Sequence, residues 1–179
     1  MTVIVEDGSI VANANSYVAV ADADAYFALR NNTVWAGLNA TTQKAPFLIS
    51  AVDYMQQMYR MRWYGWRDNL NQTLDWPRLW VQQFDAPGNY GPAPYYFSPN
   101  VIPQEVKTAQ MMLAVRIANG DLAPDITRED MASSVKVGPI QIDYSKDSPV
   151  VTIFRAVDKV LAPLLVNDGS SMMARISRS

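Results

Sequence analysis

The chain has no cysteine and no histidine among its 179 residues. Without cysteine it can form neither a disulfide nor a thiolate nucleophile, and without histidine it lacks the commonest metal ligand and general base. A glycine-rich phosphate loop, a Gly-x-Ser-x-Gly turn and the spacing of metal ligands are also missing from the sequence. We therefore predict a non-enzymatic protein with no cofactor and no metal.

Long apolar runs and an excess of either charge are missing too. No apolar run reaches the roughly 18 residues of a membrane span, and the opening MTVIVEDGSI lacks the regions of a signal peptide. This predicts a soluble protein that is not secreted and has no membrane partner. Fifteen basic against 17 acidic residues give a net charge of −2, whereas dedicated duplex-binding domains usually carry a clear positive excess. Duplex binding is therefore disfavoured.

The spacing of apolar residues predicts a mainly α fold. With 49% hydrophobic residues the chain can build a core, and we expect a small bundle of about four helices with a short β-hairpin, an extended loop and a C-terminal tail. The expected helices cover residues 20–30, 41–63 with Thr41 or Thr42 as N-cap, 103–118, and 148–166 with Ser148 as N-cap and a kink or early end at Pro163. The hairpin should turn at Gly138-Pro139, and Asp7-Gly8 should form a second hairpin or an extended arm. Residues 1–166 are expected to form a single domain, followed by a flexible tail, 167–179.

Residues 79–102 interrupt the helical pattern. They contain four prolines, two glycines and six aromatic residues, a composition that permits neither a helix nor a central strand. So many aromatics cannot all enter the core of so small a domain, and exposed apolar patches usually mark contact sites. We therefore predict an interface loop that touches a neighbouring subunit or a tail protein through Trp80, Phe84, Tyr90, Tyr95, Tyr96 and Phe97.

A second unusual stretch, RMRWYGWRDNLNQTLDWPRLW, covers residues 60–80 and holds four of the five tryptophans beside four arginines. Exposed aromatics in a basic groove would bind single-stranded nucleic acid. Alternatively, Trp63, Trp66 and Trp76 anchor the core, with arginine stems along their rings. The core interpretation is favoured, because Pro77 restricts its own backbone and that of Trp76. This is typical of a rigid turn whose tryptophan is buried in the helical bundle.

Two pairs of acidic residues could suggest a metal site. Asp22 and Asp24 are two positions apart, and residues two apart on a helix do not face each other. A first helical turn that favours acids explains them better. Glu129 and Asp130 likewise suit a solvated face or the start of a helix.

Several segments together resemble a known family. In order, they are NSYVAVADADAYFALR, the W-x-G of Trp35 to Gly37, TTQKAPFLISAVDYM, RWYGWR with NQTLDWPR, VIPQEVKTAQMMLA, and VGPIQIDYS with FRAVDKVLAPLL. They resemble a tailed-phage family often labelled DnaT-like single-stranded DNA-binding protein. The resemblance covers roughly residues 10–166, and Gln72, Leu74 and Trp76 to Arg78 are its most specific part. Residues 79–102 depart from the family pattern.

The resemblance implies a structural role, because members of the family look like head-to-tail adaptors: small helical subunits that form a ring beneath the portal. It implies a ring of 12 copies in the neck of the virion, assembled in the host cytoplasm, with a portal protein and a tail or nozzle protein as partners. Genomic DNA would pass through the channel without sequence-specific binding, and a subunit of net charge −2 suits a conduit to which DNA must not stick. The alternative is a single-stranded DNA-binding protein.

The last 13 residues, 167–179, offer a means of attachment. Glycine and serine favour flexibility, Met172, Met173 and Ile176 are adaptable apolar anchors, and Arg175 and Arg178 are charged ones. Composition alone fits a disordered end with no role equally well. The resemblance favours attachment, because adaptor rings of this kind commonly bind the portal through terminal segments. We therefore predict that this tail docks on the portal.

Overall fold

The computed structural model describes residues 2–86, 94–120, 122, 134–137, 140–143 and 154–166. Its helices are α1 (Val20–Ala28), α2 (Thr33–Ala36), α3 (Ala45–Tyr59), α4 (Gln104–Ile117) and α5 (Arg155–Leu161), with a π-helical turn η1 (Ala40–Lys44) and a 3-10 turn η2 (Ala162–Leu164). Strand β1 (Trp66–Arg67) pairs with β2 (Arg78–Leu79), and β3 (Ser134–Val137) pairs with β4 (Ile140–Asp143), both antiparallel. The predicted fold class, mainly α with a short hairpin, is confirmed. Within the described ranges no helix is long and apolar enough to cross a membrane.

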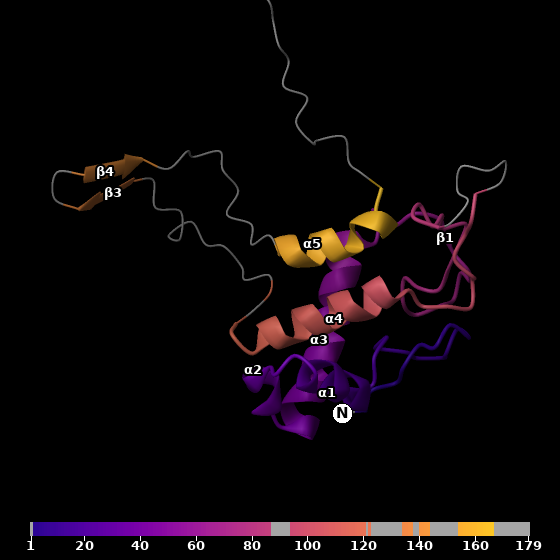
Figure 1. The fold of residues 1–179 in the computed structure, drawn as a ribbon, viewed down its shortest axis with the longest axis horizontal. Helices are drawn as coiled ribbons and strands as arrows, with labels where there is room; N and C mark the ends of the chain where they lie inside the picture. Colours follow the sequence, from indigo (N-terminus) through magenta and orange to yellow (C-terminus); the bar gives the residue numbers. More distant parts are fainter. Residues whose placement is uncertain are drawn as a thin grey trace, which may run out of the picture.

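Helix α3 packs against α4, and α4 packs against α5; in Figure 1, α3 runs across both. Its buried side includes Leu48, Val52 and Met55, spaced so that they lie on one face. At the far end of α3, the Tyr59 hydroxyl donates to Asp158 of α5 over 2.7 Å. Burial raises the pKa of Tyr59, and the carboxylate of Asp158 raises it further, so this link between the helices persists through neutral pH.

A buried glutamine joins three parts of the chain. The Oε1 atom of Gln110 accepts from Tyr17 N over 3.0 Å, and its Nε2 donates to Ser16 Oγ and to Leu48 O over 2.6 and 2.9 Å. Because a buried amide without partners is unfavourable, these three bonds fix α4 against α3 and the N-terminal segment.

The N-terminal residues form an extended arm and not a hairpin at Asp7-Gly8. The buried carboxylate of Glu6 accepts from the backbone N–H groups of Gly8, Ile10 and Val11 over 2.9–3.0 Å. Gly8 has φ +108°, and a Cβ there would collide with the carbonyl oxygen of Asn100, so only glycine fits where the arm meets the chain before α4.

Several predicted boundaries are wrong. Helix α3 ends at Tyr59, before Trp63, because the chain turns there: Trp63 bridges to Leu165, and Gly65 takes φ +68°. The N-cap of this helical region is Asn39, whose Oδ1 accepts from both Thr41 N and Thr42 N. Helix α2, which the sequence did not predict, is capped by Asn32.

The C-terminal helix is confirmed only in part. It begins at Arg155, and the predicted cap at Ser148 lies outside the described residues. As expected near Pro163, α5 ends at Leu161 and the chain continues as the 3-10 turn η2.

Asp24 has a different role from the one expected, because only Asp22 lies in the first turn of α1. Asp24 Oδ1 accepts from Trp35 Nε1 over 2.7 Å and from Lys44 Nζ over 2.9 Å. The desolvation of this carboxyl is outweighed by the bonds from Lys44 and Trp35, and the pKa of Asp24 is lowered. Asp24 therefore fastens α2 and η1 to α1.

Candidate interaction surface

The tryptophan- and arginine-rich stretch 60–80 divides into a buried and an exposed half. Trp63 and Trp76 are 5% and 0% exposed, as expected of core anchors, whereas Trp66 and Trp80 are 73% and 67% exposed. The expectation that Trp66 anchors the core is therefore wrong. Trp66 lies in the two-residue strand β1, opposite Leu79 of β2, at the outside of the molecule.

The buried half is a rigid support. The rings of Trp63 and Trp76 meet edge to face with centroids 5.7 Å apart, and the peptide bond between Trp76 and Pro77 is cis. The Tyr17 hydroxyl oxygen accepts from the backbone N–H groups of Asp75 and Trp76 over 3.1 and 3.2 Å. The predicted burial of Trp76 is confirmed.

Arg78 stabilises this turn through hydrogen bonds to the backbone. Its guanidinium donates to the carbonyl oxygens of Tyr64, Asp75 and Gly65 over 2.9, 3.2 and 2.7 Å. Gln72 adds further bonds from its Nε2 to the carbonyl oxygens of Leu74 and Pro77, over 2.8 and 3.0 Å. The side chains of Gln72 and Arg78, which belong to the most specific part of the sequence, thus bind backbone carbonyl oxygens of the same chain.

Asp75 is a buried carboxylate within this support. Its Oδ1 lies 3.2 Å from Arg60 Nε, and its Oδ2 accepts from Trp63 Nε1 over 3.3 Å. Burial raises the pKa of Asp75, although the charges of Arg60 and Arg78 act in the opposite direction. An ionised carboxylate buried in this way would destabilise the fold without the positive charges beside it.

The exposed half continues into residues 79–97. Gln83 N donates to Tyr95 O and Phe97 N to Val81 O, each over 2.8 Å, so the two ends of the predicted loop run side by side. We use the term aromatic surface for the exposed residues Trp66, Trp80, Phe84, Tyr95 and Tyr96.

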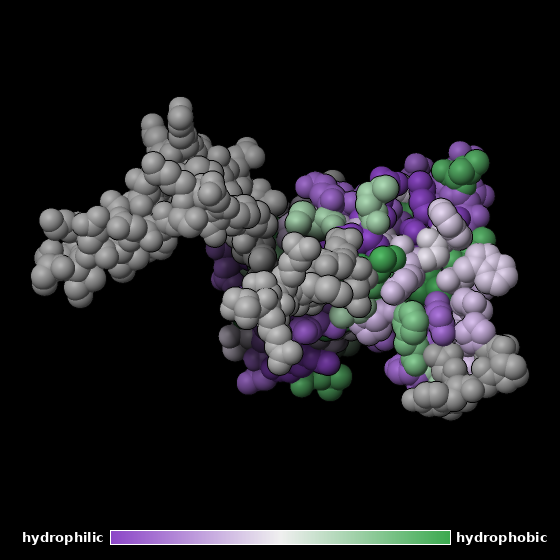
Figure 2. Space-filling view, turned by 90° about the horizontal axis from the view of Figure 1, so that it is seen from above, coloured by the Kyte–Doolittle hydropathy of each residue, from purple (hydrophilic) through white to green (hydrophobic). Residues whose placement is uncertain are grey.

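Ring contacts hold parts of this surface in place. The rings of Trp80 and Tyr96 meet edge to face with centroids 5.6 Å apart, and Phe84 lies 5.4 Å from the ring of Tyr64. Seen from above, pale and green atoms lie among purple ones at the end of the molecule where β1 lies in Figure 1 (Figure 2). These two contacts help to hold the rings of Trp80, Tyr96 and Phe84 in place at the surface.

The structure places four of the six predicted interface residues at the surface, which leaves their role as an interface a prediction. Trp80, Phe84, Tyr95 and Tyr96 are exposed, Phe97 is half-buried against the core, and Tyr90 lies outside the described residues. At its base the segment takes part in the fold: Leu79 pairs in β2, which belongs to a sheet of two strands and is no central strand, and Val81 and Ile102 are buried. The predicted tail residues Met172, Met173, Arg175, Ile176 and Arg178 lie outside the described residues.

Most charge near the aromatic surface is already paired. Arg78 is buried, Arg67 donates to Gln72 O, and Arg60 lies against Asp75. Residues 79–102 contain one charged side chain, that of Asp85. The aromatic surface is thus more suited to apolar contact than to phosphate.

A family model described as "Putative DnaT-like ssDNA binding protein" matches residues 1–179. The chain belongs to this family. The comparisons with curated proteins and with solved structures gave no significant match. The description of the DnaT-like family agrees with the alternative of single-stranded DNA binding, and nothing in the comparisons concerns a phage adaptor.

In this member of the DnaT-like family, the exposed position of Trp66 was not predictable from hydrophobic spacing. A strand of two residues is shorter than any window in which alternation can be counted. The available signal was Gly65, which marks the tight turn of the chain: its φ is +68°, and a Cβ there would collide with the carbonyl oxygen of Leu79.

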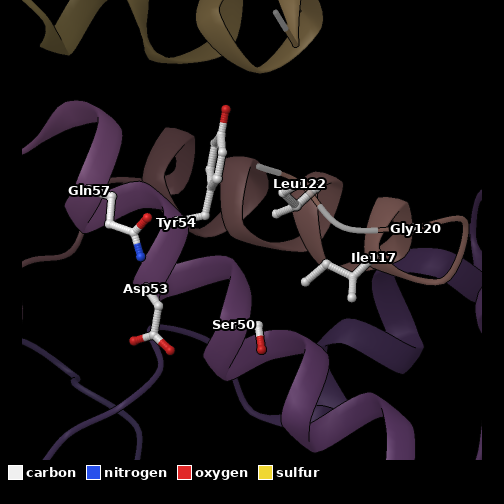
Figure 3. Close-up of a pocket in the computed structure, with 7 residues that line it drawn as sticks. All are labelled: Ser50, Asp53, Tyr54, Gln57, Ile117, Gly120 and Leu122. Carbon is white, nitrogen blue, oxygen red and sulfur yellow. The ribbon is translucent and has the colours of Figure 1, made fainter. Parts of the chain in front are cut away.

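A separate hollow lies between α3 and the end of α4 (Figure 3). Asp53, Gln57 and Ser50 of α3 border it, with Ile117 and Leu122 opposite. Burial raises the pKa of Asp53, but among the described residues that line the hollow this is the one carboxylate. In the described part of the chain no group of three acidic residues is placed to hold a metal ion.

Proposed function

We propose that this protein is a non-enzymatic structural subunit that assembles into a ring of about twelve copies between portal and tail in the neck of a tailed phage. The observation that carries the proposal is the aromatic surface: five exposed aromatic side chains beside a buried support in which Arg67 and Arg78 bind backbone carbonyl oxygens and Arg60 pairs with Asp75. Apolar surface of this kind gains most from contact with another protein. The ring, the portal and the tail protein come from the resemblance to head-to-tail adaptors.

The charge of the chain agrees with this role. A channel that conducts DNA must not retain it, and binding to duplex grows with each phosphate that a lysine or arginine neutralises. A subunit of net charge −2 brings no excess of such groups. On this proposal, genomic DNA passes through the channel without sequence-specific binding, and the subunits assemble in the host cytoplasm before they become part of the virion.

The double variant Trp66→Ser/Trp80→Ser tests the surface. Both side chains are exposed, so we expect the free energy of unfolding to change by about 0.5 kcal/mol or less per site, while ring formation is lost. Analytical ultracentrifugation with and without portal particles measures the assembly. Leu29→Ser is the matched control, because Leu29 is exposed and apolar but lies at the end of α1. Rings formed as readily by the double variant as by the control would contradict the proposal.

The tail gives a second prediction. Truncation after Val166 should leave a folded subunit, by circular dichroism, that no longer co-sediments with portal particles. The reason is that a weak contact repeated around a ring gives a durable joint, and every copy would lose it together. If the truncated protein still co-sediments at wild-type stoichiometry, the tail is not the clamp and residues 79–102 become the better candidate.

The second candidate function is single-stranded DNA binding. The family description favours it, as do Trp66 and Trp80, on which bases could stack. Titration of an oligonucleotide at low and moderate salt separates the two functions. Tight binding with a steep salt dependence that disappears in Trp66→Ser/Trp80→Ser would establish the second candidate. Our proposal predicts weak binding that the double variant leaves unchanged.

A further inference from the structure

The chain leaves α5 and η2 beside the aromatic surface. Val166 N donates to Arg62 O over 2.7 Å, Tyr64 N donates to Leu164 O over 2.9 Å, and Leu165 bridges to Trp63. The segment 62–64, which makes these bonds, leads directly into Trp66. In Figure 1, α5 and η2 end on the side of the molecule where β1 lies. Residues 167–179 therefore start next to Arg62, only a short stretch of chain before the strand that presents Trp66.

The 13 residues that follow are long enough to cover this surface. Residues 167–179 span up to about 43 Å when extended, at roughly 3.3 Å per residue. A random coil of this length has an average end-to-end distance of about 20 Å. A segment tethered so close meets the surface at an effective concentration of the order of millimolar, without any partner.

The chemistry of this segment fits aromatic rings. Met172 and Met173 can place sulfur against ring edges, and Arg175 and Arg178 can lie over ring faces. The chain already uses such a contact elsewhere: the Arg30 guanidinium lies 3.5 Å from the centroid of Tyr26. Residues 79–102 carry no positive charge and one acid, Asp85, so no cation of their own opposes an incoming arginine.

We propose that residues 167–179 dock on the aromatic surface of their own chain in the free subunit. This docking does not rest on the ring assembly proposed above and can be tested on the isolated protein.

Acrylamide quenching of tryptophan fluorescence provides the test in the full-length chain. Trp35, Trp63 and Trp76 are buried, so Trp66 and Trp80 dominate the quenchable emission. In Met172→Ser/Met173→Ser/Ile176→Ser, the accessible share should rise from near none to about two of the five tryptophans. Ser170→Ala/Ser171→Ala is the control and should quench as the wild type does. The measurement is made at a concentration where the wild type sediments as a monomer.

Two results would overturn the proposal. Equal quenching in wild type, variant and control would show that the tail does not cover the surface. A wild-type protein that is dimeric at every concentration tested, and becomes monomeric in the triple variant, would show that the tail binds a second copy. If quenching behaves as expected but Trp66→Ser/Trp80→Ser still forms rings, the covering stands and the proposed role of the surface in assembly fails.

Discussion

Replacement of Trp76 by alanine should lower the free energy of unfolding by about 3–5 kcal/mol, the usual loss for a large aromatic side chain removed from a core. Trp76 is fully buried, and its ring meets that of Trp63 edge to face. The surroundings cannot collapse into the gap, because the backbone of Asp75 and Trp76 is held by the Tyr17 hydroxyl. Among the described residues Trp76 Nε1 has no hydrogen-bond partner, so the loss reflects packing.

Urea denaturation followed by circular dichroism measures this loss. Trp66→Ala is the matched control, since the same side chain is removed from an exposed position, and its effect should stay within about 0.5 kcal/mol. A loss below about 1 kcal/mol for Trp76→Ala would show that Trp76 is no core plug and would revive stacking as its role.

The second large effect is expected for Arg78→Met, which keeps much of the side-chain volume and removes the charge. Removing one partner of a buried ion pair typically lowers the free energy of unfolding by about 3–5 kcal/mol. Here the carbonyl oxygens of Tyr64, Gly65 and Asp75 lose their donor. The carboxylate of Asp75 also loses a nearby positive charge that stabilises its ionised form.

The pH dependence of Arg78→Met separates these two causes. In the folded protein burial raises the pKa of Asp75, and the variant should raise it further. A carboxyl whose pKa is higher in the folded than in the unfolded state destabilises the fold when ionised, and this penalty disappears as the pH falls through the folded-state pKa. The stability deficit of Arg78→Met should therefore shrink on acidification.

Arg30→Met provides the comparison, because Arg30 is exposed and interacts with Tyr26 at the surface. Its deficit should be about 0–1 kcal/mol. A deficit of Arg78→Met that is equally large at every pH would assign the whole effect to the lost carbonyl bonds and would exclude the charge on Asp75 as a cause.

Much of the fold could be predicted from the sequence where one periodic pattern extends over many residues. Helices α1, α3 and α4 and the hairpin β3–β4 follow this rule. The errors fall where a single side chain outweighs the pattern. Asn39 moves the helix start by capping Thr41 and Thr42, and the turn at Gly65 ends the helical region early.

The exposed surface was predictable in outline only. Composition showed that residues 79–102 hold too many aromatics for the core, and four of the predicted six are exposed. It could not show that Trp66 joins them, because that depends on β1 pairing with β2 across a gap of ten residues, 68–77. Nor could it show that Arg78 serves carbonyl oxygens, because these belong to a turn that forms only in the folded chain.

In the assembly that we propose, the aromatic surface joins copies of this protein into a ring beneath a portal. Electron cryo-microscopy of the full-length protein assembled on portal particles would show this contact. We expect a closed ring of about twelve copies, with Trp66 and Trp80 of each copy buried against the next. A map in which these two side chains face solvent, or in which the protein joins the portal without contacts between its own copies, would contradict it.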